Sequence, residues 1–369
     1  MERAVARVEY DAIRANCTKL SEGLSEGAEL CAVVKADGYG HGDVDAAGAA
    51  LAGGATRLAV ATAVEADRIG HRFPHVPLLT MGALTAAEVD IALAAGSELA
   101  LWREPFRVVV ADRARALGRP ARVHVKLDTG MGRLGTPDPD EALALARACA
   151  ADPDLELAGI WTHLATADDP DSEFFAQQLD RFEPVAAAVK AEFPEVVAHA
   201  ANSAATLRDR RSHHDMVRCG VAIYGLDPFQ SDPAERGLAP ALSLRSHVAD
   251  LKRFEPGDTA GYGRRWAAPE ETWVGVVPLG YGDGVRRGLS DNAEVLVGGR
   301  RRPVVGTISM DNLTVDLGPE GGVEPGDEAV LIGVQGEDRI LAEEVAARLD
   351  TINYEVTCGI SARVPRRAA

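Results

Sequence analysis

Between Leu30 and Arg218, short apolar runs alternate with alanine-rich amphipathic stretches. In stretches such as 140–150 and 174–192, apolar residues recur at helical spacing, which predicts helices. Strands and helices in alternation are typical of a parallel sheet with covering helices. The eight apolar runs therefore predict an α/β fold that begins with a (β/α)8 barrel of the TIM type. The predicted strands are Leu30–Val34, Leu58–Ala61, Pro77–Met81, Glu98–Leu101, Arg122–Leu127, Leu157–His163, Val196–Ala200 and Met216–Arg218.

The pattern changes after Pro240 to valine, glycine and short turns, with one helix predicted near residues 342–349. This part predicts a second, mainly β domain. Because Asp227–Pro240 is polar and rich in proline, we expect the barrel in residues 1–235 and the second domain in residues 236–369. Residues 1–10 are a separate case, since the alternation in Ala4–Glu9 also suits pairing with the second domain.

Charge and cysteine content exclude several classes of function. The net charge of −17 and the isoelectric point near 5.0 disfavour binding to nucleic acid or to a membrane surface. The chain has no apolar run of membrane-spanning length and no signal-peptide pattern, so we expect a cytoplasmic protein. The five cysteines are widely spaced and include no CxxC pair, which argues against disulfides and against a metal site.

One lysine, Lys35, follows the first predicted strand and precedes a glycine-rich turn. A cation at the end of a buried strand must be paired, reach solvent or lose its proton through desolvation. A desolvated amine can form a Schiff base, whereas a side chain that merely reaches solvent is the structural alternative.

Other polar residues follow later strands, and the carboxyl ends of barrel strands converge on one mouth. Their position predicts an active site there. Lys126 is a special case, because alternation in RVHVKLD places His124 and Lys126 in the barrel interior, where an unpaired ammonium is costly. The residues expected at the mouth are Lys35, Arg133, His163, Asn202, Ser203 and Arg218.

The motifs AVVKADGYGHG, KLDTGMGRLG, HAANSAATL, VRCGVAIYGLDP, AGYGRRW, GTISMDN and INYEVTCGISARVPR follow one another along the chain. In this order they resemble the motifs of alanine racemases, over nearly the whole chain. The resemblance implies an isomerase of fold type III that depends on pyridoxal 5'-phosphate, has a barrel and a β domain, and is usually a homodimer.

The resemblance assigns two bases to the reaction. Lys35 matches the lysine that binds the cofactor covalently and acts on one face of the substrate. Tyr262, in GYGRR, matches the tyrosine that the partner subunit contributes to the opposite face. Racemisation requires a base on each face, because a single base favours returning the proton to the side from which it came. A phenol is a weak base at neutral pH, so we expect His163 and Arg218 to support Tyr262.

Arg218 matches the arginine that faces the pyridine nitrogen of the cofactor. Since a guanidinium cannot accept a proton, that nitrogen should stay neutral, which weakens the electron sink and limits side reactions. His163 and Asn202 match cofactor-side positions. The resemblance implies that the cofactor phosphate is bound by Tyr39, Ser203, Tyr354 and the backbone amides of Gly220 and Val221.

On the substrate side, Arg133 matches the arginine near the substrate carboxylate, where a planar bidentate cation suits an amino acid. Met310 and Asp311 match a pair that reaches across the dimer. Lys126 matches a lysine that is often carbamylated in this family, so we expect that modification here. The residues that match the substrate access corridor are Asp168, Tyr281, Arg287 and Ile352.

The implied function is the interconversion of L- and D-alanine, which supplies D-alanine for peptidoglycan. A racemase of broader specificity, for serine, lysine or arginine, is a close alternative, because sequence does not reveal pocket volume. A decarboxylase of the same fold is a weaker alternative, since it does not require a base at Tyr262. The intact second domain argues against a non-catalytic pyridoxal-phosphate carrier, as such relatives are single barrels.

Overall fold

The computed structural model describes residues 2–369. They form two compact units. The barrel unit is Ile13–Ile223, and the second unit combines the residues up to Ala12 with Tyr224–Ala369. The unit boundary therefore lies earlier than the expected one at residue 235. The segment after Tyr224 belongs to the second unit because its backbone bonds there, as in the 2.9 Å hydrogen bond from the Asp227 amide to Glu343 Oε1.

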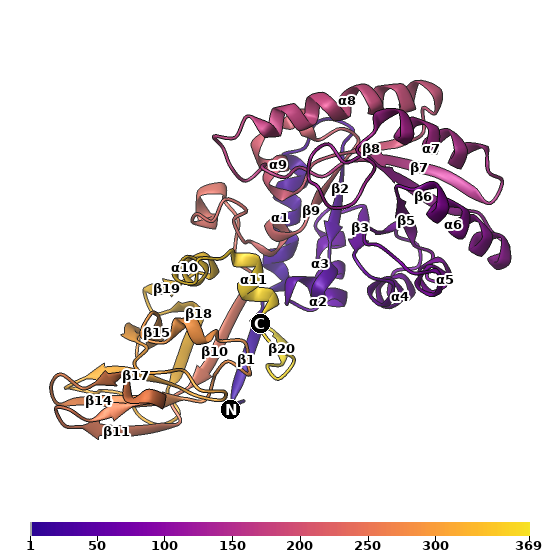
Figure 1. Ribbon diagram of the computed structural model, residues 1–369. Helices are drawn as coiled ribbons and strands as arrows, with labels where there is room; N and C mark the ends of the chain where they lie inside the picture. Colours follow the sequence, from indigo (N-terminus) through magenta and orange to yellow (C-terminus); the bar gives the residue numbers. More distant parts are fainter. Residues whose placement is uncertain (1) are drawn as a thin grey trace. The chain divides into compact units, whose positions relative to one another are not determined.

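Eight parallel strands build the barrel unit in the order β8-β7-β6-β5-β4-β3-β2-β9 (Figure 1). Backbone hydrogen bonds of 3.0 Å, from Asp215 to Ala198 O and from Arg218 to Ala201 O, nearly close the barrel between β8 and β9. The predicted (β/α)8 barrel is confirmed. Its strands are β2 (Glu29–Val33), β3 (Arg57–Val60), β4 (Leu78–Thr80), β5 (Glu98–Leu101), β6 (Ala121–Lys126), β7 (Leu155–Trp161), β8 (Val197–His199) and β9 (Met216–Cys219).

The barrel strands are buried along almost their whole length. All residues of β4, β5 and β9 are buried, as are all but the first residue of β2 and β3. Side chains on one face fill the barrel interior and those on the other pack under helices, which explains why these strands are apolar runs and not alternating patterns.

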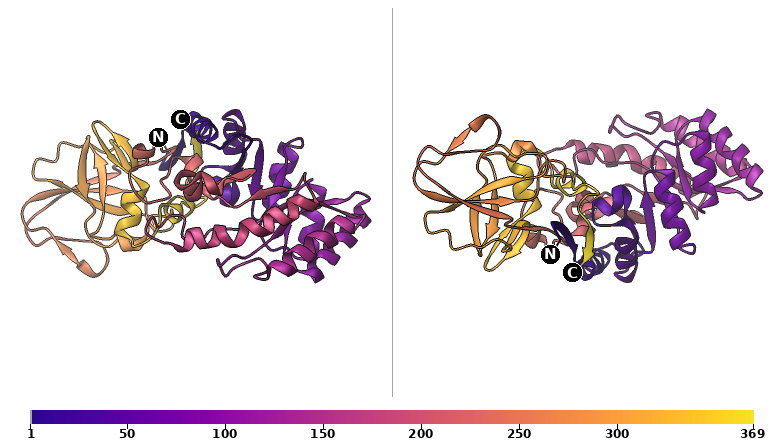
Figure 2. Two further views of the ribbon diagram at one scale, coloured as in Figure 1. Left: turned by 90° about the horizontal axis from the view of Figure 1, so that it is seen from above. Right: turned by 90° about the horizontal axis from the view of Figure 1, so that it is seen from below.

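Helices surround the barrel, and Figure 2 shows the long α8 lying along its outside. Two of them begin with a capping box, in which Thr62 pairs with Glu65 and Thr85 with Glu88. The helices are α1 (Tyr10–Glu22), α2 (Lys35–Tyr39), α3 (Asp43–Ala52), α4 (Ala63–Arg72), α5 (Ala86–Ala94), α6 (Glu104–Leu117), α7 (Pro139–Ala151), α8 (Phe174–Glu192) and α9 (Ser203–Arg208).

The second unit is mainly β, as predicted, and its described residues form three sheets. The largest has the order β16-β15-β18-β10-β1-β20, with β19 paired to β18; β11-β14-β17 and β12-β13 form the others. Its elements are β1 (Ala4–Val8), β10 (Leu242–His247), β11 (Asp250–Phe254), β12 (Thr259–Ala260), β13 (Trp266–Ala267), β14 (Thr272–Val277), β15 (Glu294–Val297), β16 (Arg300–Pro303), β17 (Leu313–Gly318), β18 (Glu328–Gln335), β19 (Asp338–Ile340), β20 (Arg366–Ala368), α10 (Ala342–Arg348) and α11 (Asn353–Cys358).

Strand β1 lies inside this largest sheet and not in the barrel. It pairs antiparallel with β10, from Ala4 opposite Ser246 to Val8 opposite Leu242, and parallel with β20. The alternating burial of β1 and β10 matches their alternating sequence, because one face of each strand packs inward.

Two helical glycines allow a test of helix packing around the barrel. A Cβ on Gly70 of α4 would lie 2.4 Å from Ala95 O, whereas the atom nearest to a Cβ on Gly48 of α3 is Phe73 Cζ at 3.9 Å. We expect Gly70→Ala to lower the free energy of unfolding by about 1–3 kcal/mol through steric overlap. The matched control Gly48→Ala should raise it by about 0.5–1 kcal/mol through helix propensity. Urea denaturation measures both, and equal effects would contradict the packing argument.

Candidate active site

Lys35 begins a short left-handed turn at the end of β2. Ala36, Asp37, Gly38 and Tyr39 have φ values of 53°, 54°, 60° and 53°. Left-handed backbone costs roughly 1–2 kcal/mol for each residue other than glycine. Strain of this kind persists only where the surroundings impose it, and it is concentrated at functional sites.

Neighbouring side chains hold this turn in place. The Ala36 amide donates to Glu65 Oε1 at 2.7 Å, and Glu65 Oε2 accepts from the Ala61 amide at 2.9 Å. The buried ring of His41 lies with Nδ1 3.0 Å from both Gly38 O and Tyr39 O. The position of Lys35 is therefore fixed by contacts from α4 and from its own turn.

Tyr39 approaches the loop after β9 very closely. A Cβ on Gly220 would lie 2.2 Å from Tyr39 Oη, so only glycine permits this contact. Ser203 Oγ accepts hydrogen bonds from the backbone amides of Gly220 at 3.0 Å and Ala222 at 3.3 Å. Val221, between them, is buried. Hydroxyl groups and backbone amides around a glycine are a donor set that fits a phosphate group.

Arg218 is buried in the barrel interior. Its Nη1 lies 2.8 Å from His199 Nδ1, and its Nη2 donates to Thr162 O at 2.9 Å and Ala200 O at 3.0 Å. Its Nη2 also lies 3.3 Å from Nδ1 of His163. Burial lowers the pKa of Arg218 to about 10, so the guanidinium stays charged at neutral pH. Burial, and then the Arg218 cation, hold the pKa of His163 well below its usual range.

Lys126 lies in the barrel interior, as the alternation of its strand predicts, and only 2% of the residue is exposed. Its Nζ sits 4.2 Å from the centre of the Trp161 ring. Burial, followed by the positive charges of Arg218, Arg133 and Lys35, lowers its pKa to about 7. Three of the predicted residues, Arg218, Arg133 and Lys35, thus act on one buried amine.

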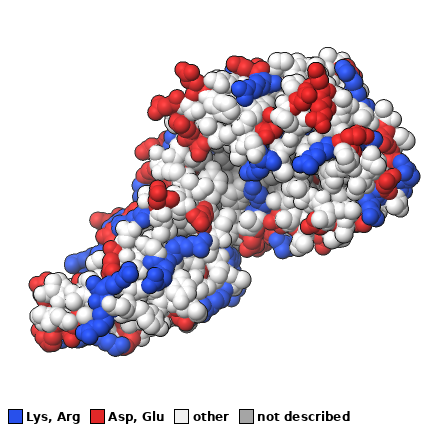
Figure 3. Space-filling view, viewed as in Figure 1, with Lys and Arg blue, Asp and Glu red and all other residues white. Residues whose placement is uncertain are grey.

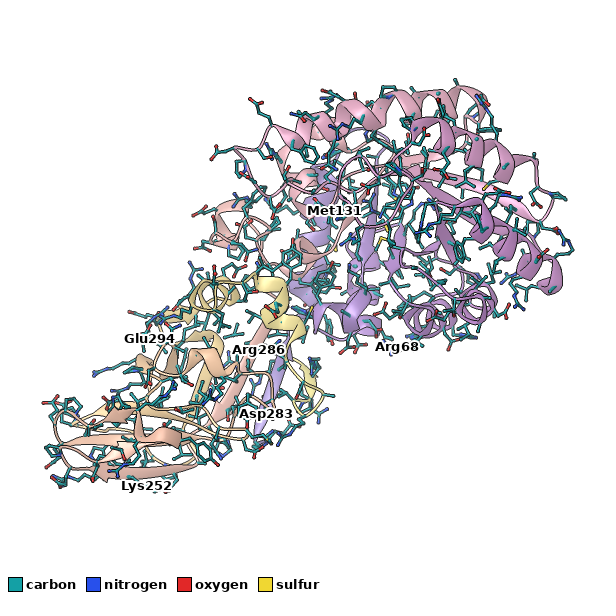
Figure 4. The ribbon with its side chains drawn as sticks, viewed as in Figure 1. Arg68, Met131, Lys252, Asp283, Arg286 and Glu294 are labelled. Atoms are coloured by element: carbon teal, nitrogen blue, oxygen red, sulfur yellow. The ribbon has the colours of Figure 1, made fainter. Side chains whose placement is uncertain are left out.

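Arg133 lies in the loop after β6, which Met131 marks in Figure 4. Asp128 organises this loop, because its Oδ1 accepts from the amides of Gly130 at 2.9 Å and Met131 at 2.7 Å. Arg133 is exposed. After β8, Asn202 caps α9 by accepting from the Ala205 amide at 3.0 Å, while its Nδ2 donates to Leu164 O at 3.3 Å. Asp168, in the loop after β7, is exposed.

The second unit brings another group of the predicted residues together. Tyr262 is 74% exposed, and Met310 and Tyr281 are also exposed. Thr307 Oγ1 donates to Tyr262 O at 2.8 Å, the Tyr281 amide to Ser309 O at 3.0 Å and the Gly282 amide to Met310 O at 2.9 Å. Segment 307–310 thus binds both tyrosine-bearing loops.

An ion-pair network anchors the same loops. Asp283, labelled in Figure 4, is fully buried and pairs with Arg3 and, at 3.5 Å, with Arg363. Arg363 Nη2 also donates to Asp311 Oδ1 at 2.8 Å. Arg363 therefore links Asp311 to a buried carboxylate.

Three predicted residues remain. Ile352 and Tyr354 lie at the start of α11, whereas Arg287 lies elsewhere in the second unit. Ile352 is exposed at the N-terminal end of α11, and Tyr354 is in its first turn. Arg287 is exposed in a 3₁₀ helix of residues 287–289. Buried Asn353 fixes α11, because its Nδ2 donates to Glu343 Oε1 and to Asp227 O, both at 2.8 Å.

Acidic and basic side chains are interspersed over the face of the barrel unit seen in Figure 3. Within residues 2–369, no helix combines the length and apolar character that a bilayer crossing requires. The same residues contain no cluster of three or more His, Cys, Asp or Glu side chains suited to a metal ion.

Comparison with known proteins adds a decisive observation. Residues 8–228 match the N-terminal domain of alanine racemase, and residues 241–368 match its C-terminal domain. An alanine racemase from Symbiobacterium thermophilum is 41% identical over 362 residues, which cover 98% of this chain and 96% of the relative. This chain belongs to the alanine racemase family.

Solved structures of alanine racemases agree with this assignment. The enzyme from Streptomyces lavendulae, a producer of D-cycloserine, has a TM-score of 0.95 at 36% identity, with 100% of this chain and 97% of that chain covered. The enzyme from Streptomyces coelicolor A3(2) has a TM-score of 0.94 at 39% identity, with coverage of 99% and 98%. The chain is accordingly an isomerase, and the alanine racemase family uses pyridoxal phosphate.

Sequence reasoning missed several residues that shape this alanine racemase site. Glu65, Trp161, His199 and Glu98 fix or surround the predicted ones. The only sequence signal was polar character inside or beside apolar strands, as for Glu98 in ELAL. Polarity of this kind does not identify a partner, because contacts between distant strands depend on the barrel geometry.

The low pKa of Lys126 predicts how stability depends on pH. Its folded pKa of about 7 lies below the ordinary lysine value of 10.5, so the unfolded chain binds the proton more tightly. The resulting destabilisation is fully present below pH 7 and disappears as pH rises toward 10.5. In carbon dioxide-free buffer, Lys126→Met should therefore raise the free energy of unfolding at pH 6.5, by on the order of 3 kcal/mol, and progressively less at higher pH. Denaturant titrations across pH measure this, and a gain independent of pH would contradict it.

Proposed function

We propose that this chain interconverts L- and D-alanine with pyridoxal phosphate bound at the barrel mouth. The observation that carries the proposal is Lys35, fixed on a strained turn where its charge acts on both Lys126 and His163. A lysine amine at a barrel mouth is a group that can bind an aldehyde cofactor as a Schiff base. Family membership over both domains supports the reaction class.

The two bases of the reaction are Lys35 and Tyr262. Pyridoxal phosphate, when bound, withdraws electron density from the α-carbon of the substrate and makes its proton removable. Lys35 Nζ takes or returns this proton on one face, and Tyr262 Oη does so on the other. Bases on opposite faces invert the configuration, because the proton that leaves and the proton that arrives use different sides.

Arg218 keeps the ring nitrogen of the cofactor unprotonated. A guanidinium only donates hydrogen bonds, and this one remains charged at neutral pH. Its Nη2 is already bound to two backbone carbonyls, which supports a fixed orientation for the donors that remain. His163 and Asn202 line the same side of the site.

The phosphate group is assigned to the hydroxyl and amide cluster around Gly220. Tyr39 Oη, Ser203 Oγ and the backbone amides of Gly220 and Val221 are its proposed donors, with Tyr354 as a further phenol. The contact between Tyr39 and Gly220 supports this assignment, since any side chain at residue 220 would displace the phenol.

We propose a homodimer in which each site takes Tyr262, Met310 and Asp311 from the partner subunit. Exposed large apolar side chains mark interaction surfaces. Among the described residues of the second unit there are five such side chains, and four of them are predicted site or corridor residues, namely Tyr262, Tyr281, Met310 and Ile352, the fifth being Val334. Asp168, Arg287, Tyr281 and Ile352 are the proposed access corridor.

Arg133 is the proposed contact for the substrate carboxylate, with Lys126 as its support. Carbamylation requires a neutral amine, whose nitrogen attacks carbon dioxide and then loses a proton to leave a carbamate anion. The pKa of about 7 makes Lys126 a suitable amine at neutral pH. Carbamylation would turn Lys126 from a buried cation into an anion, which could then act as the counter-ion of Arg218 and Arg133. Product D-alanine would serve peptidoglycan synthesis in the cytoplasm.

The two-base assignment predicts a one-sided defect. Tyr262→Phe should retain the visible absorbance of the bound cofactor and lose racemisation by a factor of about 100 or more. Exchange of the α-proton for deuterium should persist for one alanine enantiomer only, because Lys35 still serves its face. Proton NMR of each enantiomer in deuterated water measures this exchange, and equal exchange of both would contradict the assignment.

A mixed dimer provides the matched control. Lys35→Ala alone should abolish the visible absorbance and the activity. Protomers carrying Lys35→Ala and protomers carrying Tyr262→Phe can be exchanged to form mixed dimers. If sites are shared between subunits, one of the two sites in each mixed dimer then contains both Lys35 and Tyr262. Activity should recover to about a quarter of wild type. No recovery after verified subunit exchange would show that both bases come from one chain.

The carbamate predicts a signal of its own. Enzyme equilibrated with ¹³C-labelled bicarbonate near neutral pH should show a protein-bound ¹³C carbamate resonance, since Lys126 offers a neutral amine there. Lys126→Arg should lose that resonance, because arginine stays protonated. A spectrum of the wild type without the resonance would contradict carbamylation.

A further inference from the structure

A line of hydrogen bonds runs through the barrel interior from Glu98 to Arg218. Glu98 Oε2 lies 2.6 Å from His124 Nε2, His124 Nδ1 lies 2.9 Å from His199 Nε2, and His199 Nδ1 lies 2.8 Å from Arg218 Nη1. All four residues are buried, with at most 4% of each residue exposed. They come from four different strands or strand ends, so the barrel itself assembles the line.

Local features of the strands make room for this line. The register of β6 against β7 shifts between Val123 and His124, and such a bulge re-aims a side chain. A Cβ on Gly159, the partner of His124 in β7, would lie 2.0 Å from His124 Nδ1. The His199 ring is stacked on Trp161, with ring centroids 5.5 Å apart and an interplanar angle of 9°.

Arg218 and Glu98, at the two ends of the line, determine which ring nitrogen carries the proton in His199 and in His124. Arg218 only donates, so His199 Nδ1 must accept and the His199 proton is on Nε2. This proton can bond only if His124 Nδ1 accepts, which places the His124 proton on Nε2. Glu98 Oε2 accepts that proton. One assignment therefore satisfies all three contacts.

Glu98 is the negative end of the line. Burial opposes its ionisation, but hydrogen bonds from His124 and Arg122 lower its pKa. Burial, and then the Arg218 cation, keep the pKa of His199 well below its usual range, so its imidazole is neutral. The line thus carries one negative end, one positive end and a neutral His199 between them.

We propose that Glu98, His124 and His199 are positioning residues that keep the Arg218 guanidinium oriented as a donor at the barrel mouth, with Glu98 setting the tautomer of both histidines. The tautomers follow from contacts within the barrel alone. Their effect on the reaction rests on the proposed function, because it acts through the role given to Arg218.

Replacing Glu98 by glutamine should reverse the donor and acceptor in each hydrogen bond between residue 98 and His199. Arg122 Nε donates to Glu98 Oε1 at 2.7 Å, so the single carbonyl oxygen of glutamine is drawn to that side. The glutamine amino group then faces His124 Nε2, which must accept. His124 and His199 both move their proton to Nδ1, and a donor now faces the donor of Arg218.

The experiment records ¹⁵N spectra of holoenzyme labelled at histidine, with signals assigned through single His→Gln variants. In the wild type at neutral pH, His124 and His199 should both be neutral with the proton on Nε2. In Glu98→Gln both should carry it on Nδ1, and kcat should fall about tenfold or more while the KM for alanine changes little.

Glu98 pairs with two arginines, Arg122 and, at 3.6 Å, Arg57. Two matched controls share these arginines without touching His124. Glu29→Gln removes a partner of Arg57, and Glu156→Gln removes a partner of Arg122. Both should keep wild-type tautomers and kcat. A loss of kcat in these controls equal to that in Glu98→Gln would overturn the proposal, since the effect would then come from the arginines.

Other outcomes are equally decisive. Wild-type spectra with either histidine protonated on Nδ1, or on both nitrogens, would overturn the proposal even if the enzyme racemises alanine. Unchanged tautomers in Glu98→Gln would also overturn the role of Glu98. If that variant does not fold, the wild-type spectra decide. Correct tautomers in a protein without racemase activity would support the line and contradict the proposed function instead.

Discussion

The buried guanidinium of Arg218 is the charge around which the barrel interior is arranged. An isolated cation would be very costly in a closed apolar barrel, so its environment must compensate for lost water. Two backbone carbonyls and His199 accept its hydrogen bonds, and its Cζ lies 4.8 Å from the centre of the Trp161 ring. The same ring also faces the ammonium of Lys126. Trp161 thus offers its electron-rich faces to two cations.

The consequence of that crowding is visible in the other groups at the mouth. Burial, and then each added positive charge, disfavours protonation of the next group, which explains the lowered pKa of Lys126 and of His163. A site that needs neutral amines and neutral imidazoles at physiological pH can obtain them in this way. Rigid strands keep the cations close, and the strained turn after Lys35 prevents that residue from relaxing away from them.

The architecture and most of the mouth could be predicted from sequence, because each depends on local patterns. Apolar runs identified all eight strands, and the alternation in RVHVKLD placed Lys126 in the interior. Contacts between distant residues could not be predicted. The alternation in Ala4–Glu9 indicated that β1 suits the second unit, but not that β10, more than two hundred residues away, is its partner. The handedness of the turn at Ala36 runs against the preference of its residues. The alternation in RVHVKLD also placed His124 in the interior. Its position against Gly159 depends on a β-bulge, which the alternation of apolar and polar residues does not predict.

The pairing of β1 with β20 has a consequence for how the chain matures. Synthesis on the ribosome delivers β1 before the barrel unit and β20 after it. Residues 13–223 emerge as a continuous stretch and are able to fold during translation, whereas the largest sheet of the second unit stays one edge strand short until β20 leaves the exit tunnel. Until then β1 exposes the backbone groups that β20 later covers, so this edge is the place where a nascent chain most needs protection from wrong strand pairing.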